Sequence, residues 1–415
     1  MAFHFPPALT HRKYLYLWLG LLISMAGSQM QFAAIHWHIR ELTGEPDPLA
    51  LGGIGLVRIL PVVVFSFLGG AVADNYNRRK ILFFTQSTLA IQAMLLAYLT
   101  FTGVVEIWHI YLLTAIQASA AAFDLPARQA MVPNLVSREH LPSAFSMNSI
   151  AFNTGAILGP LLFGFVPEGG QGLAYLFNSI SFLAVLAALF LMGQVHQDVN
   201  KAGGISLKSM GDGVRFIFSK PLILSTMIMD FIATFFASAN TMLPIVARDI
   251  LSVGKSGYSW LVSSQAIGSV LAGMVVSQIR ELRRQGPLFI ASVTLFGLAT
   301  VWFGLSRTFI PAVSALLLIG ASDAVSTVIR NTIRQLQTPD HIRGRMTSVN
   351  QLFFLGGPQL GEVEAGLVAS LFGVPFAIVS GGIGCIAGMF LIIMKWPQLV
   401  SYNGDESNLA SVPAV

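Results

Sequence analysis

Long apolar segments are the feature that most limits what this 415-residue chain can fold into. The apolar residues fall in blocks of roughly 18 to 25 with few charges inside them, the length a helix needs to cross about 30 Å of hydrocarbon. Charged residues make up 10% of the chain, against about 25% in soluble domains. Backbone polar groups inside a bilayer must be satisfied within the chain, so unbroken runs of this length indicate helices. The sequence therefore predicts an all-α integral membrane protein.

Twelve transmembrane helices are expected. Arg12 and Lys13 precede the first apolar block, as they would in a secretory signal peptide, but the block continues to about Ile39 without a small-residue cleavage site, so it is read as a retained span. The predicted spans are 14–39, 51–73, 81–103, 107–126, 144–166, 173–194, 222–246, 258–279, 288–306, 309–329, 346–370 and 374–396.

The basic residues predict the orientation of these spans. Counted over alternate sides of the membrane, 19 of the 24 Lys and Arg residues fall on one side, which the positive-inside rule makes cytoplasmic. Both termini then lie in the cytoplasm, and the chain belongs to the inner (plasma) membrane. Because the excess of positive charge sits in short loops between spans, it indicates topology rather than nucleic-acid binding.

The two halves repeat at an offset of 202 residues. Identical residues in this register are Gly, Asn, Ser and Arg rather than common apolar types, so chance composition does not explain them. An even number of spans in each copy gives two parallel six-helix repeats, the arrangement of transporters whose site lies between the halves. The matched pairs are Arg128 with Arg330, Ser146 with Ser348, Asn148 with Asn350, Gly155 with Gly357, Gly159 with Gly361, and Gly164 with Gly366.

Four segments are predicted from this pattern. They are an N-terminal six-helix bundle (1–195), a cytoplasmic linker (196–221), a C-terminal six-helix bundle (222–396) and a cytoplasmic tail (397–415). The linker mixes basic and apolar residues as an interfacial amphipathic helix does, but four glycines leave a flexible connection equally open.

Metal and cofactor sites are not expected. Cys385 is the only cysteine, so one chain can form neither a disulfide framework nor a thiolate metal site. His36 and His38 are two residues apart on a predicted helix and therefore point in different directions, which disfavours a shared metal. A nucleotide-binding motif is also missing from the sequence, so an ion gradient is the expected energy source.

The loop between the second and third spans resembles the signature loop of the major facilitator superfamily, G-x-x-x-D-R-x-G-R-R-K. The resemblance implies a conformational latch formed by Gly70, Asp74, Arg78, Arg79 and Lys80. Small residues let the helix ends approach, and the carboxylate can hold a cation or a helix N-terminus on a neighbouring span. Asn75 and Asn77 replace the family's Arg and Gly, and an ordinary positive-inside turn is the alternative.

The fifth span is similar to the G-x-x-x-G-P-x-x-G-G motif associated in that superfamily with exporters that work as antiporters. The matching residues are Gly155, Gly159, Pro160 and Gly164, with Phe163 in place of a glycine. Ordinary packing of small residues would give the same pattern. The stretch Asp124–Val136 and the linker sequence look like the branch that contains enterobactin exporters and macrolide efflux proteins.

Charges within spans are expensive and therefore mark candidate functional residues. Arg58 in span two, and Glu362 and Glu364 in span eleven, fall at comparable depth in the outer half of the membrane. In the superfamily fold these spans face each other, which implies an outer gate in which Arg58 pairs with a glutamate, Glu362 being slightly favoured. Separate charges lining a wet vestibule are the alternative.

Asp230 lies in span seven on one helical face with Thr226, Thr234 and Thr241. The resemblance implies that this span lines the cavity, so Asp230 is the first candidate for a proton or cation site, with Glu362 and Glu364 as the others. A carboxylate buried against a neighbouring span is the alternative.

Matched arginines predict an inner gate. Arg128 and Arg330 each have a carboxylate nearby in sequence, Asp124 and Asp323 respectively, and such pairs can form and break between states. Helix capping with positive-inside charge would also account for them. The residues expected to line the cavity are Ser28, Gln31, Gln117, Thr226 and Thr234.

These features predict a secondary active transporter working by alternating access, in which a proton-coupled exporter (antiporter) of an amphipathic small molecule such as a drug or siderophore is favoured. A proton-coupled importer would share every topological feature, and a non-transporting receptor or a membrane enzyme is a more distant alternative. The expected partners are a small-molecule substrate, protons or another coupling ion, and membrane lipids, without nucleic acid. A monomer is plausible.

Overall fold

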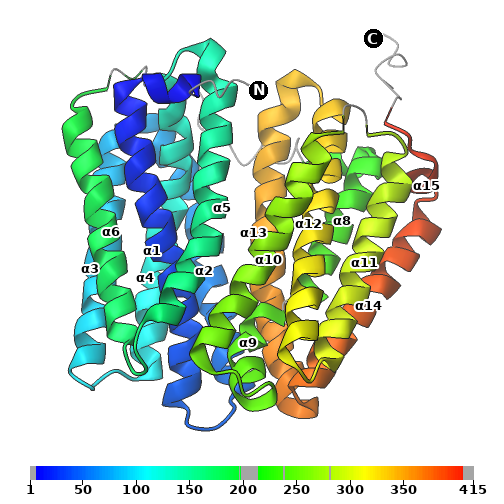
Figure 1. Ribbon diagram of the computed structural model, residues 1–415. Coiled ribbons are helices and arrows are strands. Elements are labelled where there is room, and N and C mark those ends of the chain that lie inside the picture. The colour runs from blue at the N-terminus through cyan, green and yellow to red at the C-terminus, as the bar shows by residue number, and fades with distance from the viewer. Residues whose placement is uncertain (1–5, 196, 198–213, 237–238, 280–281, 405–415) are drawn as a thin grey trace. The chain divides into compact units, whose positions relative to one another are not determined.

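The computed structural model describes residues 6–195, 197, 214–236, 239–279 and 282–404, drawn as coloured ribbon in Figure 1. Every regular element within these ranges is helical, which confirms the predicted all-α class. Most of the predicted linker and the end of the tail lie outside the described residues.

The chain forms two compact units. One contains Met1–Pro46, Val57–Ile205 and Gly254–Ser263, and the other contains Asp47–Leu56, Ser206–Val253 and Ser264–Val415. The first unit therefore includes residues 254–263, although the helix that they begin continues in the second unit. The second unit includes residues 47–56, although the helix that begins there continues in the first unit. These segments lie at the start of the second helix of each sequence repeat. The predicted boundaries at 195 and 222 remain a prediction.

The first unit is built on α1, which packs against both α5 and α6, while α3 packs against α4 and α6. Figure 1 shows α1 in dark blue between the green ribbons of α5 and α6. The helices are α1 (Arg12–Leu42), α2 (Pro48–Asn75), α3 (Arg78–Phe101), α4 (Ile107–Met131), α5 (Leu141–Phe165) and α6 (Gln171–Met192).

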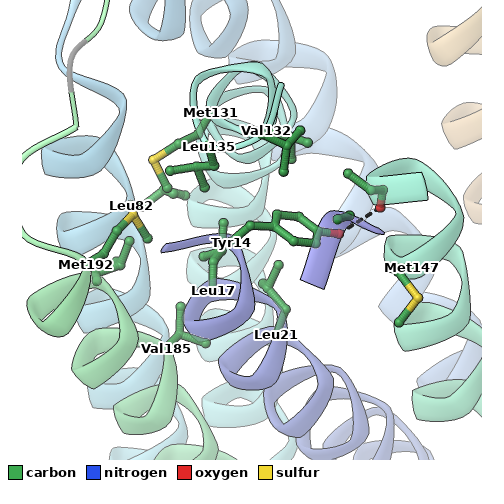
Figure 2. Close-up of a cluster of buried hydrophobic side chains, with 14 of the residues drawn as sticks. Tyr14, Leu17, Leu21, Leu82, Met131, Val132, Leu135, Met147, Val185 and Met192 are labelled. Atoms are coloured by element: carbon green, nitrogen blue, oxygen red, sulfur yellow. Dashed lines mark hydrogen bonds between the residues drawn. The ribbon is translucent and has the colours of Figure 1, made fainter. Parts of the chain in front are cut away.

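A dense apolar cluster fills the end of the first unit where α1 begins (Figure 2). Leu17 and Leu21 of α1 meet Met131 of α4 and Met192 of α6 there, all of them buried. Tyr14 is fully buried in the same cluster, and its hydroxyl donates to the carbonyl oxygen of Ala144 at 2.7 Å. A buried tyrosine needs such a partner for its hydroxyl, so this bond fixes the start of α1 against α5.

The second unit has the same plan, with α8 packed against α13 and α14 and α11 packed against α12 and α14. A π-helical turn, Val246–Ile250, and the residues 251–253 precede α10. The helices are α8 (Pro221–Phe236), α9 (Leu243–Ile245), α10 (Gly254–Ser277), α11 (Gln285–Leu305), α12 (Phe309–Gln337), α13 (Asp340–Phe372), α14 (Val374–Lys395) and the short α15 (Gln398–Ser401).

Each predicted span corresponds to a long helix, but several boundaries differ. Span four was expected to end near residue 126, yet α4 continues through Pro126 to Met131. Span seven was expected over 222–246, and the apolar helical stretch of this region is Pro221–Ile250, within which α8 covers Pro221–Phe236 and a 3-10 turn, Ala239–Met242, comes before α9. Pro244, which has no N–H to donate, lies in the first turn of α9, where the missing N–H leaves no intrahelical hydrogen bond unmade.

Ten helical stretches among the described residues are long and apolar enough to cross a membrane by composition alone. α5 and α13 are not among the ten, although both occupy predicted spans. α5 carries Asn148, Asn153 and Thr154, and α13 carries Glu362 and Glu364. Such residues lower mean hydropathy without preventing a helix from crossing, provided that their polar groups face protein.

Candidate functional site

A buried ion pair joins two helices of the second unit. Asp230 of α8 and Arg330 of α12 are 5% and 4% exposed, and an Nη1–H of Arg330 donates to Oδ1 of Asp230. Asp230 was predicted as a proton site and Arg330 as part of an inner gate. The structure brings these two residues, 100 positions apart, into direct contact.

A second carboxylate lies beside the same guanidinium. Oδ1 of Asp323 is 3.6 Å from Nη2 of Arg330, and the Asp323 side chain is 45% exposed. Nη2 also donates to the hydroxyl oxygen of Thr327 at 2.6 Å. Asp323, Thr327 and Arg330 occur at spacings of four and three residues, so they share one face of α12. We call Asp230, Asp323 and Arg330 the charged cluster.

The charged cluster lies well inside its helices. Asp230 is nine residues from the start of α8 and Arg330 is seven from the end of α12, which places them about 10 to 14 Å from those ends. Charges at such depth are expensive unless they are paired. One arginine placed against two carboxylates is therefore an arrangement in which a proton can compete for a shared partner.

A neighbouring arginine extends the cluster toward the end of α12. Nε of Arg334 donates to the carbonyl oxygen of Arg330 at 3.3 Å, and its two terminal nitrogens donate to Asn331 and Asn350. Asn350 is one of the residues repeated between the two halves. Its counterpart in the first unit, Asn148, accepts from the hydroxyl of Tyr14 at 3.0 Å. Both repeated asparagines thus accept a side-chain donor within their own unit.

The first unit has a carboxylate–arginine pair at the matching helix. Asp124 and Arg128 of α4 form an i, i+4 ion pair. Asp124 also accepts from the hydroxyl of Thr85 at 2.8 Å and from Nε2 of Gln86 at 2.7 Å, both on α3. Arg128 and Arg330, the two arginines of the predicted inner gate, are therefore each paired with a carboxylate of their own unit. The gate itself remains a prediction.

The predicted outer-gate residues fall in different units. The guanidinium of Arg58 lies 4.8 Å from the ring centre of Phe32, a cation–π contact within the first unit. In the second unit, Glu362 is buried and packs on α2 at Gly55, where an added Cβ would come within 2.7 Å of the Cβ of Glu362. Glu364 is half-buried. Glu362 therefore contacts α2 one turn before Arg58, and their pairing stays a prediction.

The residues predicted to line a cavity have varied surroundings. Thr226 is fully buried, and its hydroxyl donates to the backbone carbonyl oxygen of Ile223. The hydroxyl of Thr234 donates to the backbone carbonyl oxygen of Asp230. Ser28 and Gln117 are half-buried. Gln31 is fully buried in a polar network that the sequence did not suggest.

That network crosses the middle of the first unit. Nδ2 of Asn178 on α6 donates to Oε1 of Gln31 on α1 at 2.7 Å, and Nε2 of Gln31 donates to Oε1 of Gln92 on α3 at 3.3 Å. All three side chains are buried. Hydrogen bonds between side-chain amides hold membrane helices together where apolar contacts give no net driving force.

The predicted latch loop is tied to its own unit. Asn77 caps α3 by accepting from the backbone N–H groups of Arg79 and Lys80, and Nε of Arg78 donates to the carbonyl oxygen of Ala73 at 3.2 Å. Nε of Arg79 donates to the carbonyl oxygen of Leu189 on α6 at 2.9 Å. Gly70 is half-buried, and the side chain of Asp74 lies outside the described part of the structure.

Glycines of the fifth-span motif allow α5 to cross α1 closely. A Cβ on Gly155 would lie 2.8 Å from the backbone carbon of Met25, and one on Gly159 would lie 2.6 Å from the carbonyl oxygen of Ala26. Pro160 is buried inside α5. A Cβ on Gly164 would instead meet Ser259 at the start of α10, at 3.0 Å.

Replacing Gly159 with Ala should therefore destabilise the protein by about 1 to 3 kcal/mol, the usual penalty for overpacking. The matched control is Gly273→Ala on α10, where an added Cβ meets nothing within 4 Å and alanine should stabilise the helix by about 0.5 to 1 kcal/mol. Thermal unfolding of the detergent-solubilised variants, followed by size-exclusion chromatography, measures both. Equal stability of the two variants would show that the α1–α5 crossing has room to spare.

Lys255 is a buried cation that the sequence did not single out. It lies near the start of α10, is 2% exposed, and its ammonium donates to the carbonyl oxygens of Val166 and Pro167 at the end of α5. The hydroxyl of Tyr258 donates to the carbonyl oxygen of Ala33 at 3.1 Å. The segment 254–263 is therefore anchored on α5 and α1. We call this contact the Lys255 anchor.

The described residues contain no group of three or more His, Cys, Asp or Glu that could hold a metal ion.

A family model described as a transmembrane secretion effector matches residues 4–414. The chain belongs to the transmembrane secretion effector family. The match spans both repeats, so the resemblance to the major facilitator superfamily is confirmed. This chain is thus a multi-pass membrane transporter.

Curated relatives of this transporter include the enterobactin exporter EntS of Shigella boydii serotype 18. The two are 24% identical over 396 residues, which cover 93% of this chain and 92% of the relative. EntS of Escherichia coli O139:H28 matches with the same identity and coverage.

Solved transporters share the fold of this family member. A bacterial homolog of the human lysosomal transporter Spinster, in an inward-facing and unoccupied conformation, superposes with a TM-score of 0.72 at 13% identity, covering 96% of this chain and 97% of that one. A POT family transporter in complex with 5-aminolevulinic acid gives 0.75 at 12% identity, covering 94% and 96%. These likenesses show that the chain has the all-α fold of these transporters.

Proposed function

We propose that this transporter is a proton-coupled exporter of amphipathic small molecules in the inner membrane, with both termini in the cytoplasm, and that the charged cluster is its proton site. The observation that carries the proposal is the buried contact of Arg330 with Asp230, beside the second carboxylate of Asp323. Similarity to enterobactin exporters over nearly the whole chain supports the direction and the substrate class.

Proton exchange follows from the shared guanidinium. With Asp230 ionised, its carboxylate holds Arg330 and ties α8 to α12. A proton that binds a carboxylate oxygen of Asp230 removes this charge, and Arg330 then turns to Asp323 on its own helix. The pairing of the arginine is kept in both protonation states, which limits the cost of leaving a charge unpaired in the membrane. Protonation of Asp230 therefore releases the contact between α8 and α12, while Arg330 stays paired with Asp323 within α12.

Alternating access would use the two exchanged segments. The Lys255 anchor attaches the start of α10 to the end of α5 in the first unit. In the other unit, Gly52 and Gly55 of α2 pack closely on α13. Because α10 belongs to the second sequence repeat and α5 to the first, any state in which these repeats separate at this end must break the anchor. A contact that is present in one state and broken in another suits a moving element.

Transport into everted membrane vesicles tests the proposal. An acid interior, generated by respiration, should drive uptake of ethidium or enterobactin by vesicles that contain the wild-type protein, since uptake into everted vesicles corresponds to export from cells. Asp230→Asn should lose this uptake to the level of vesicles without the transporter. Uptake by right-side-out vesicles with the opposite pH dependence would instead establish an importer.

Asp124→Asn is the matched control. Asp124 is also a buried carboxylate paired with an arginine, but it accepts further hydrogen bonds from Thr85 and Gln86. We expect this variant to keep pH-driven uptake if it reaches the membrane in normal amounts. Equal loss in both variants would show that the loss is not specific to the charged cluster and would contradict its assignment as the proton site.

A further inference from the structure

An apolar groove runs along the first unit, separate from the charged cluster. It encloses about 610 Å³ and is lined by α1, α5 and α6 together with the residues that follow α5. Its lining includes Ile23 and Ala26 of α1, Leu158 and Leu162 of α5, and Phe177 of α6. α5 and α6 both pack on α1, which in Figure 1 lies between them.

The lining is suited to an alkyl chain. Among the described residues that form the groove, only Thr154 and Ser181 have polar side chains and none is charged. The hydroxyl of Ser181 donates to the carbonyl oxygen of Asn178 at 2.7 Å, so its proton is already used within α6. A ligand in this groove would gain apolar contacts and lose few hydrogen bonds.

The length of the groove corresponds to one leaflet. From Thr154 to Phe165 the lining follows α5 for 11 residues, which is about 16 Å. The hydrocarbon core of a bilayer is about 30 Å thick. The groove therefore extends from near the middle of the membrane to one surface. It ends at Val166 and Pro167, in the connection between α5 and α6 that the positive-inside pattern places outside the cell.

The groove is continuous with the lipid-facing surface of the transporter. Ile23 is 52% exposed and Phe177 is 56% exposed, although both are large and apolar. Leu183 of α6, outside the groove, is equally exposed at 52%. In a protein of a membrane-spanning family, such side chains are covered by lipid tails. The groove differs from the rest of this surface in being concave, so a chain within it would touch protein on several sides.

We propose that the groove binds one acyl chain of an outer-leaflet phospholipid and retains it more strongly than the surrounding surface retains lipid. The site is built by α1, α5, α6 and the residues between α5 and α6, and it is independent of the direction of transport and of the proton site. Gly155 and Gly159 bring α5 close to α1 at Met25 and Ala26, and Ala26 lines the groove. An occupied groove would then support the same pair of helices from the membrane side.

Photocrosslinking in proteoliposomes tests this assignment. The probe is a phosphatidylethanolamine with a diazirine in the middle of one acyl chain, and the labelled peptides are identified by mass spectrometry. We expect labelling of Ile23, Leu158 and Phe177 to exceed labelling of Leu183 by about tenfold, equivalent to ~1.4 kcal/mol of preference. Similar yields at all equally exposed side chains would mean ordinary annular lipid and would overturn the proposal.

A groove-filling variant gives the second arm. Leu158→Trp should abolish labelling of Ile23 and Phe177 and leave labelling of Leu183 unchanged, while the control Leu183→Trp should leave the groove labelled. The wild-type labelling pattern decides the matter even if Leu158→Trp does not fold. A diazirine-bearing alkane without a headgroup that labels the groove as strongly as the phospholipid would overturn the phospholipid assignment. Weak labelling of the groove combined with a crosslinked dimer would assign the face to a second copy instead.

Discussion

The variant Arg330→Gln should be destabilised by about 3 to 5 kcal/mol relative to the wild type, because it leaves Asp230 buried without its cation. The double variant Asp230→Asn/Arg330→Gln should recover most of this loss, since it removes the uncompensated charge as well. A double-mutant cycle over the four proteins isolates the coupling between the two side chains. Thermal and denaturant unfolding in one detergent provide the free energies.

Arg128→Gln is the control for this cycle. Its partner, Asp124, keeps hydrogen bonds from Thr85 and Gln86 when the arginine is removed. The loss of stability should therefore be smaller than in Arg330→Gln. If the two single variants were equally stable, or if the double variant were no better than Arg330→Gln, the ion pair would not be the main contact that holds Asp230.

Lys255→Ala should release the start of α10 from α5. Removing the ammonium removes charge-assisted hydrogen bonds to Val166 and Pro167, a loss of roughly 3 kcal/mol that raises the detached population about 100-fold. The readout is the rate at which an impermeant maleimide labels Ser259→Cys, whose position is 1% exposed. Because Cys385 is the single native cysteine, Cys385→Ala gives a clean background.

Lys13→Ala controls for the loss of an ammonium–carbonyl bond as such. Lys13 donates to the carbonyl oxygen of Gln194 at 2.8 Å, but it does so at an exposed position, where such a bond contributes little. Labelling of Ser259→Cys should not change in this variant. Unchanged labelling in Lys255→Ala as well would show that the contacts of Tyr258 and Ser263 suffice to hold the segment.

The helical fold was predictable because the bilayer imposes both helix length and internal hydrogen bonding. Helix ends were less so. Span four was expected to end near residue 126, but α4 continues past Pro126 to Met131, since packing can compensate for one missing backbone bond. The 3-10 turn Ala239–Met242 in span seven had no clear signal in an apolar run.

Residues of the charged cluster could be selected from sequence, but their pairing could not. Charge within an apolar run marked Asp230, and the repeat register marked Arg330. Periodicity defines which face of its own helix a residue occupies, not which helix lies opposite. The contact depends on the packing of α8 and α12, whose residues are 100 positions apart. Lys255 was missed for the same reason, because its partners are the backbone carbonyl oxygens of Val166 and Pro167, just after α5, which carry no sequence signature.

The most direct test of the central claim compares two modes of transport in proteoliposomes. Wild-type protein should accumulate ethidium against its gradient when the lumen is acidic and should also exchange labelled for unlabelled ethidium without a pH gradient. Asp230→Asn should retain the exchange and lose the pH-driven accumulation, because only net transport requires a proton to be released. Accumulation that persists in Asp230→Asn with wild-type pH dependence would contradict the assignment of the charged cluster as the proton site.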